Sequence, residues 1–167
     1  RDWHIWCAAS STGEEPYTLA MICKDFLGLE QNEWDTKILA TDIDTKVLEK
    51  AVKGIYARNS VEQLPHQYVR RFFKQISQEE YKVKEELKRE VLFRQLNLMN
   101  PLPFKKPLHV VFIRNVMIYF DEPTKERLLN NIYEKMAPGG YLFIGSTESM
   151  GQNNTRFQYV KPSIYRK

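Results

Sequence analysis

The stretch WCAASSTGEEPY, residues 6–17, leads from an apolar segment through a turn of small residues into two glutamates and a proline. The apolar residues on either side predict a strand over 4–9 and a helix over 16–29, since proline is favoured at the first helical position. A strand, a tight turn and a helix N-terminus in this order form the ligand-binding turn of parallel α/β folds. The stretch therefore predicts an α/β fold with a ligand near this turn.

Strand-like and helix-like segments alternate through the rest of the chain. Such alternation predicts one domain with an open, mostly parallel sheet, because parallel neighbours need crossover connections. The helix over 16–29 is expected to bury Leu19, Cys23, Phe26 and Leu27. Residues 80–96 are ambiguous, with a polar edge strand or hairpin expected before the strand that ends the segment. Further strands are expected over 36–43, 91–96, 109–115, 141–146 and a closing hairpin at 156–160 and 163–167, and further helices over 45–54, 61–73 and 122–136.

The composition is that of an ordinary globular domain. Of the 167 residues, 43% are hydrophobic and 28% are charged, and the longest apolar runs are far too short to cross a bilayer. Cys7 and Cys23 have no metal-like spacing and are expected to be buried thiols in a reducing compartment. The net charge of +4 and the pI of about 9.0 allow an acidic partner, either a nucleic acid or an acidic protein.

Glu14 and Glu15 lie at the lip of the turn, where they would repel the phosphates of a dinucleotide. The turn also has only Gly13 where dinucleotide-binding turns carry several glycines. A ligand with an amino group and a sulfonium, such as S-adenosylmethionine, would instead be attracted. The structural alternative is a capping box, in which Thr12 and Glu15 satisfy the helix N-terminus. The stretch alone leaves both interpretations open.

Two other expected strands end in polar residues on the same sheet edge. Asp42 ends the second strand, where an acid can accept both ribose hydroxyls of an adenosyl group, whereas Asp44 is expected to cap the next helix. The alternative for Asp42 is a turn residue. Arg114 and Asn115 close a very apolar strand, and Tyr119 follows in the next loop. The alternative for Tyr119 is a packed aromatic ring with its hydroxyl hydrogen-bonded.

Five segments together resemble a known family. In order and spacing, WCAASSTGEEPYTLAM, ATDIDTKVLEKAVKGIY, NLMNPLPF, FIRNVMIYF and PGGYLFIGSTES are similar to the chemotaxis receptor methyltransferases, the CheR family. The resemblance covers nearly the whole chain. It implies a class I S-adenosylmethionine-dependent methyltransferase fold, which is Rossmann-like with a mostly parallel seven-stranded sheet and a reversed last strand. It also implies one methyltransferase domain over 1–167 with a small antiparallel β subdomain inserted at roughly 61–90, and the family's N-terminal helical domain is expected to be absent.

The resemblance implies a reaction and its participants. The expected enzyme transfers a methyl group from S-adenosylmethionine to glutamate carboxylates of chemotaxis receptors, giving methyl esters for sensory adaptation and S-adenosylhomocysteine as product. Its expected partner is the cytoplasmic helical domain of these receptors, and the protein is expected to be cytoplasmic and monomeric, without metal, nucleic acid or membrane insertion. The family's roles fall on Glu15, Asp42, Asn97, Leu98, Arg114 and Asn115 for the cofactor, and on Arg114 and Tyr119 for catalysis.

Two rival functions and several departures from the family accompany this prediction. One rival is a non-catalytic S-adenosylmethionine-binding adaptor, and the other is nucleic-acid binding or modification through the basic middle segment. His109 replaces a usual aspartate and Ser146 a usual histidine, neither at a matched contact residue. A segment whose arginine helps to bind the cofactor in the family has no match here. The basic middle segment comprises Arg70, Arg71, Lys74, Lys82, Lys84, Lys88 and Arg89.

Overall fold

The computed structural model describes residues 2–150 and 156–167. A seven-stranded sheet with strand order β6-β2-β1-β7-β8-β10-β9 forms the centre, and a separate three-stranded sheet has the order β3-β5-β4. The first five strands of the large sheet are parallel, and β10 and β9 are antiparallel at one edge, which confirms the predicted sheet and its reversed end. The large sheet comprises β1 (Ile5–Cys7), β2 (Ile38–Asp42), β6 (Val91–Gln95), β7 (Leu108–Ile113), β8 (Met136–Ile144), β9 (Gln158–Lys161) and β10 (Ile164–Arg166).

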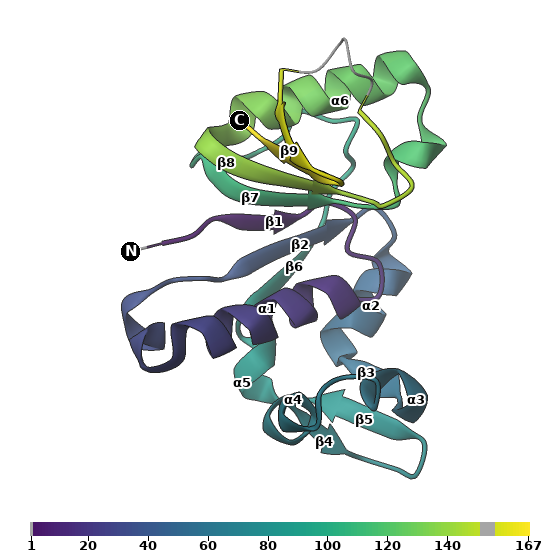
Figure 1. Ribbon diagram of the computed structural model, residues 1–167. Helices are drawn as coiled ribbons and strands as arrows, with labels where there is room; N and C mark the ends of the chain where they lie inside the picture. The colour runs from purple at the N-terminus through teal and green to yellow at the C-terminus, as the bar shows by residue number, and fades with distance from the viewer. Residues whose placement is uncertain (1, 151–155) are drawn as a thin grey trace.

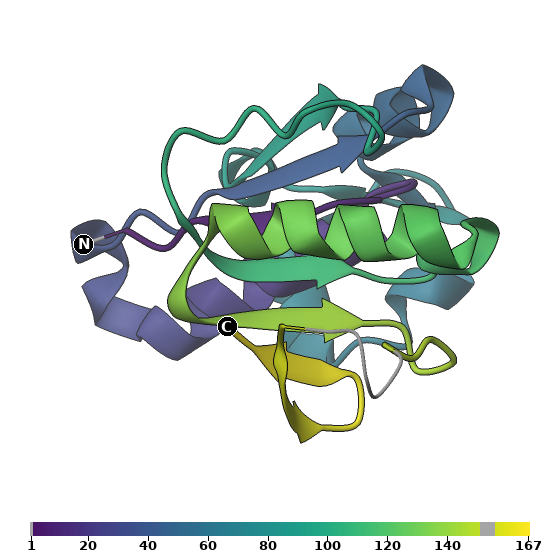
Figure 2. The same ribbon diagram turned by 90° about the horizontal axis from the view of Figure 1, so that it is seen from above.

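Helices cover both faces of the large sheet (Figures 1 and 2). Helix α6 (Glu122–Lys135) lies on one face, and α1 (Glu14–Leu27), α2 (Thr45–Lys53) and the short α5 (Glu85–Lys88) lie on the other. Successive side chains of β1 point to opposite faces of the sheet, as in any pleated strand. Trp6 packs in the core beneath α6, whereas Cys7 packs with Tyr17 in the core beneath α1. Strand β1 is thus buried on both sides and fixes the centre of the fold.

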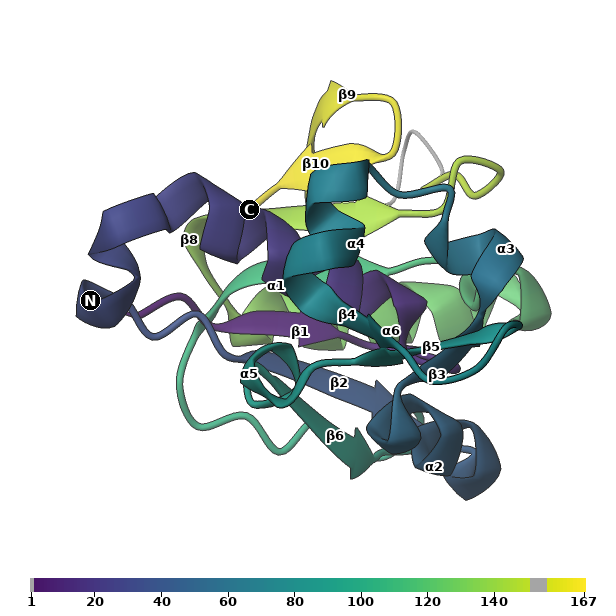
Figure 3. The same ribbon diagram turned by 90° about the horizontal axis from the view of Figure 1, so that it is seen from below.

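The small sheet lies on the same side as α1 (Figure 3). It consists of β3 (Ile55–Ala57), β4 (Phe73–Gln75) and β5 (Glu80–Val83), with α3 (Arg58–Val61) and α4 (His66–Phe72) between the first two strands. Its buried side chains share one core with α1. Strand β3 follows α2 directly after Gly54, so the small sheet begins before the predicted insertion at roughly 61–90.

Three expectations about the helices need correction. Helix α1 begins at Glu14 rather than Pro16, so the proline stands third in the helix, where its missing N–H has no intrahelical acceptor to lose. Phe26 was expected in the core, but its side chain is 76% exposed beside the Trp3 ring at the end of α1. The expected helix over 61–73 is interrupted at Pro65, which separates α3 from α4.

The cysteines and the start of β8 also differ from the sequence expectation. Cys7 is buried as expected, but Cys23 is only half-buried, and both are free thiols. Strand β8 begins at Met136, before the expected start at Tyr141, and its register against β7 shifts between Leu108 and Val110. Among the described residues, no helix has both the length and the apolar character needed to cross a membrane.

Candidate functional site

The carboxyl ends of the parallel strands place the predicted residues at one edge of the sheet. Strand β1 pairs in parallel with both β2 and β7, so the loops that follow these strands are neighbours. The arrows of the parallel strands point to the same side in Figure 2. Ligands of open parallel sheets bind at this edge. The edge therefore brings together the turn after β1, Asp42 at the end of β2 and the loop after β7.

The turn after β1 is packed tightly against its own protein. Gly13 has a φ of 96°, and a Cβ there would lie 2.9 Å from both Ala51 Cβ and the Tyr56 hydroxyl oxygen. The Tyr56 hydroxyl donates a 2.7 Å hydrogen bond to the Thr12 carbonyl oxygen. Gly13 is thus needed both for its left-handed conformation and for contact with α2 and β3. Tyr56 was not predicted as a site residue, because it lies on a strand of the small sheet, 44 positions from Thr12.

The capping-box interpretation of Glu15 is wrong. Gly13 is the residue that precedes the helix, and no side chain caps it. The Thr12 hydroxyl donates to the Glu14 carboxylate at 2.7–2.8 Å. The Glu15 carboxylate instead accepts a 2.9 Å hydrogen bond from the Arg114 guanidinium, which comes from the loop after β7. Two segments that are 99 residues apart in sequence therefore meet across the site.

Glu15 lies in a partly desolvated position. Burial raises the pKa of its carboxyl group, and the hydrogen bond and charge of Arg114 oppose that rise. Only 23% of the Glu15 side chain is exposed, against 43% for Arg114. A carboxylate in this position is a favourable neighbour for a second cationic group.

Asp42 connects the ends of two loops. One carboxylate oxygen accepts the backbone N–H of Ser11 at 2.9 Å and the other accepts that of Asp44 at 3.0 Å. Each carboxylate oxygen can accept a second hydrogen bond, so this structural role leaves two acceptor positions available. Asp44 accepts the backbone N–H of Lys46 at 2.8 Å, which confirms its predicted role as the cap of α2.

Asn97 and Leu98 follow β6 at the same edge. The Leu96 backbone N–H donates to the Asp42 carbonyl oxygen at 2.9 Å, so this loop adjoins the end of β2. The Asn97 side-chain oxygen accepts the Met99 backbone N–H in a local turn. The Leu98 side chain belongs to the core beneath α6 and is 9% exposed. Any contact of Leu98 with a ligand at the edge would therefore have to be through its backbone.

The loop after β7 carries the three predicted residues of the transfer site. Arg114 bonds to Glu15, and Asn115 adopts a left-handed conformation with a φ of 58°. Tyr119 ends the 3₁₀ turn Met117–Tyr119 and its side chain is 78% exposed. In the described part of the chain its hydroxyl has no hydrogen-bond partner, so the alternative of a packed ring with a bonded hydroxyl is wrong. The structure leaves this hydroxyl available to a substrate.

Two polar groups at this edge were not predicted as site residues. The Ser10 hydroxyl oxygen is buried and finds no hydrogen-bond partner among the described residues, an arrangement that costs free energy unless a ligand or water satisfies it. Glu148, in the loop after β8, accepts four backbone N–H groups. The Ser10 hydroxyl has no partner among the described residues, and the Glu148 carboxylate bonds to backbone groups. Neither arrangement produces a recognisable sequence pattern beyond the small residues nearby.

The donor set fits a cationic ligand with hydroxyl groups. Glu15 supplies a carboxylate for a positive group, Asp42 offers two unused acceptor positions, and Ser10 has an unsatisfied hydroxyl. S-adenosylmethionine, with its amino group, sulfonium and ribose, meets these requirements. No cluster of three or more potential metal ligands occurs within residues 2–150 and 156–167.

Three of the seven basic side chains of the middle segment have local partners. The Lys84 amino group donates to the carbonyl oxygens of Arg70 and Arg71, and Arg71 pairs with Asp25. Lys88 pairs with Glu85. These local partners weaken the case for a phosphate-binding patch.

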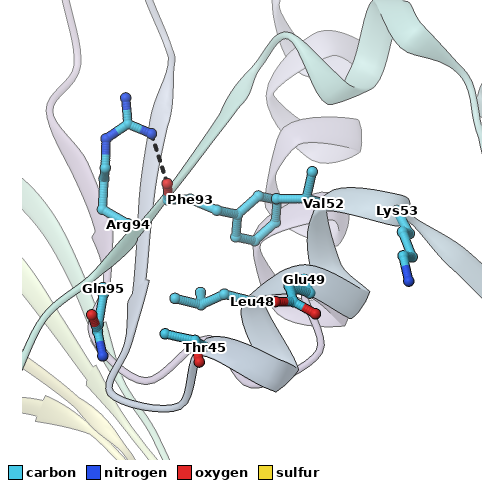
Figure 4. Close-up of a pocket in the computed structure, with 8 residues that line it drawn as sticks. All are labelled: Thr45, Leu48, Glu49, Val52, Lys53, Phe93, Arg94 and Gln95. Atoms are coloured by element: carbon cyan, nitrogen blue, oxygen red, sulfur yellow. Dashed lines mark hydrogen bonds between the residues drawn. The ribbon is translucent and has the colours of Figure 1, made fainter.

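A separate groove lies between α2 and the edge strand β6 (Figure 4). It has a volume of about 460 Å³, and none of the predicted site residues lines it. Its apolar part is formed by Leu48, Val52 and Phe93.

The α/β architecture with its mostly parallel seven-stranded sheet is the class I S-adenosylmethionine-dependent methyltransferase fold. The glycopeptide N-methyltransferase MtfA, solved in complex with S-adenosylmethionine, superimposes with a TM-score of 0.51 over 85% of this chain and 43% of that chain, at 15% identity. A SAM-dependent methyltransferase from Methanosarcina mazei gives a TM-score of 0.50 over 86% of this chain and 51% of that chain, at 14% identity. These likenesses establish the fold.

Sequence comparison gives the family. The model of the CheR methyltransferase SAM-binding domain matches residues 1–166. The chain is 40% identical over 164 residues to a chemotaxis protein methyltransferase of Borreliella burgdorferi and 38% identical over 168 residues to one of Escherichia coli, covering 98% of this chain in each case. The chain therefore belongs to the CheR methyltransferase family, whose SAM-binding domain it carries. It spans 58% of the length of each of these two relatives.

Proposed function

We propose that this protein transfers a methyl group from S-adenosylmethionine to glutamate side chains of chemotaxis receptors, forming methyl esters that serve sensory adaptation. The observation that carries the proposal is the meeting of Glu15, Asp42 and the Arg114–Tyr119 loop at one sheet edge. The names of the relatives, which are chemotaxis protein methyltransferases, support it. The acceptor is a receptor domain in the cytoplasm, which would also place this protein there.

The cofactor half of the site follows from the carboxylates. When bound, S-adenosylmethionine supplies an electrophilic methyl group on a positively charged sulfonium. Glu15 would face the cofactor's cationic groups, and Asp42 would accept the ribose hydroxyls with its unused acceptor positions. Asn97 and the backbone of Leu98 would flank the adenine, beside the end of β2. Asn115 completes this edge from the loop after β7.

The acceptor half requires alignment more than acid–base chemistry. A glutamate carboxylate is already ionised at neutral pH and needs no general base. The site has to hold this carboxylate in line with the methyl group, and good positioning can lower the barrier by several kcal/mol. Arg114 and Tyr119 present a guanidinium and an unbonded hydroxyl at the rim, where they can orient the incoming carboxylate.

Replacement of Tyr119 by phenylalanine tests the proposal. With the full-length protein and a receptor cytoplasmic fragment, Tyr119→Phe should keep its melting temperature and cofactor affinity while forming base-labile methyl esters more slowly. The matched control is Tyr159→Phe, which alters another exposed tyrosine, on β9 and outside the site.

The first of three outcomes would remove Tyr119 from the proposal, and the other two would overturn the proposed activity. Normal turnover by Tyr119→Phe would show that its hydroxyl does not take part. Cofactor binding by the parent protein without ester formation would favour the adaptor function. Methylation of nucleic acid in place of the receptor fragment would identify the other rival.

A further inference from the structure

Glu148 connects the ends of two neighbouring strands. It lies in the loop after β8, and its carboxylate reaches the loop after β7, 31–33 residues away in sequence. One oxygen accepts the backbone N–H groups of Val116 at 3.1 Å and Met117 at 2.9 Å. The other oxygen accepts those of Asn115 at 3.0 Å and Gly145 at 2.7 Å. Four donors fill all the acceptor positions of a carboxylate, so no bond remains for a ligand.

The donors belong to the loop that presents the transfer site. Asn115, Val116 and Met117 are consecutive, and the 3₁₀ turn that they begin ends at Tyr119. Asn115 holds a left-handed φ of 58°, a conformation that costs free energy for a residue other than glycine. Charge-assisted hydrogen bonds to a carboxylate are about twice as strong as neutral ones and can offset this cost.

Gly145 supplies an independent observation. A Cβ at this position would lie 2.6 Å from the Asn115 side-chain oxygen and 2.7 Å from a Glu148 carboxylate oxygen, both too close for any real Cβ. The chain at the end of β8 thus has to lack a side chain for Glu148 to reach the loop. Gly145 and Glu148 act together as a clamp on this loop.

We propose that Glu148 is a positioning residue that holds the Asn115–Met117 backbone and thereby places Arg114 and Tyr119 for methyl transfer. The effect on transfer rests on the proposed function, whereas the clamp itself does not. The four hydrogen bonds of the Glu148 carboxylate go to backbone N–H groups and not to the Arg114 or Tyr119 side chains. It acts on both through the backbone that they share.

The test combines amide hydrogen exchange with steady-state kinetics on the full-length protein. Glu148→Gln replaces one acceptor oxygen by an amide group that faces N–H donors. Amide exchange in residues 114–120 should become about tenfold faster or more, the factor implied by losing hydrogen bonds to a charged group. Exchange in β2 should stay unchanged. Turnover should fall by a larger factor than the calorimetric affinity for S-adenosylhomocysteine, because Glu15 and Asp42 would hold the cofactor from other loops whereas Tyr119 lies on the loosened loop.

Two further variants complete the design. Glu126→Gln, on the exposed surface of α6, is the matched control and should leave exchange and turnover unchanged. If Glu148→Gln does not fold, Gly145→Ala displaces the carboxylate by steric conflict and should give the same pattern.

Each possible result separates the clamp from the proposed activity. Unchanged exchange at 114–120 in a folded variant would overturn the clamp, whatever the protein catalyses. Faster exchange with unchanged turnover would overturn the positioning role. If the parent forms no esters, the proposed function fails, and the exchange measurement still decides whether Glu148 holds the loop.

Discussion

Substitution of Asp42 by alanine separates a ribose contact from a structural role. In the structure each Asp42 oxygen accepts one backbone N–H, from Ser11 or from Asp44, and keeps one position unused. Losing a hydrogen bond to a charged group costs about 1.5–3 kcal/mol. The affinity for S-adenosylhomocysteine should therefore fall by about tenfold to a hundredfold in Asp42→Ala.

A modified ligand distinguishes the two roles of Asp42. Calorimetry compares S-adenosylhomocysteine with its 2′,3′-dideoxy analogue, which lacks both ribose hydroxyls. If Asp42 binds the ribose, the substitution should weaken the natural ligand but leave the analogue's affinity nearly unchanged. Asp44→Ala is the matched control, since it removes the cap of α2 at a cost of about 1 kcal/mol in stability without facing the ligand.

Two results would refute the reasoning on Asp42. An unchanged affinity for S-adenosylhomocysteine in a folded Asp42→Ala protein would exclude the ribose contact. Equal losses for both ligands would show that Asp42 acts only by holding the turn at Ser11.

Two further predictions concern the turn after β1. Tyr56→Phe removes the hydrogen bond to Thr12 and should weaken cofactor binding, measured by calorimetry, by about twofold to tenfold. Tyr81→Phe, on the neighbouring strand, should not weaken it. Equal cofactor affinities in the two variants would contradict a role of the Tyr56 hydroxyl in holding the turn for the cofactor. Burial raises the pKa of Glu15 above its unfolded value, so the folded protein binds the proton more tightly and its stability should fall as pH rises through that range. Glu15→Gln should lack this fall in urea unfolding between about pH 4 and pH 7, and an identical pH slope in both proteins would contradict the assignment.

Much of the fold follows from the alternation of strand and helix patterns. The apolar runs predicted all five parallel strands, and the predicted closing hairpin is the antiparallel pair β9 and β10. The errors arose where local pattern and tertiary contact disagree. Phe26 has the spacing of a core residue, but α1 ends there beside Trp3 and leaves it exposed. The start of β8 was missed because Pro138 and two glycines resemble a helix stop, whereas they form an irregular strand segment.

The sequence predicted that the candidate site residues meet at one sheet edge, but not the contacts among them. Glu15, Asp42 and Arg114 each follow a parallel strand, so topology alone brings them to one edge. Glu148 was missed because its partners are backbone N–H groups, which every residue except proline has. Tyr56 was missed because the small sheet reaches the turn only in three dimensions.

The acids at the turn explain how one geometry can serve ligands of opposite charge. A helix N-terminus carries a partial positive charge that favours phosphate when glycines allow close approach. Here the single glycine, Gly13, faces Ala51 and Tyr56 instead of a ligand, and two acids occupy the first helical turn. Glu14 is bonded to the Thr12 hydroxyl, which leaves Glu15 as the acid that faces the site. The positive helix end is thereby offset by carboxylates, and a cationic cofactor becomes the favoured ligand.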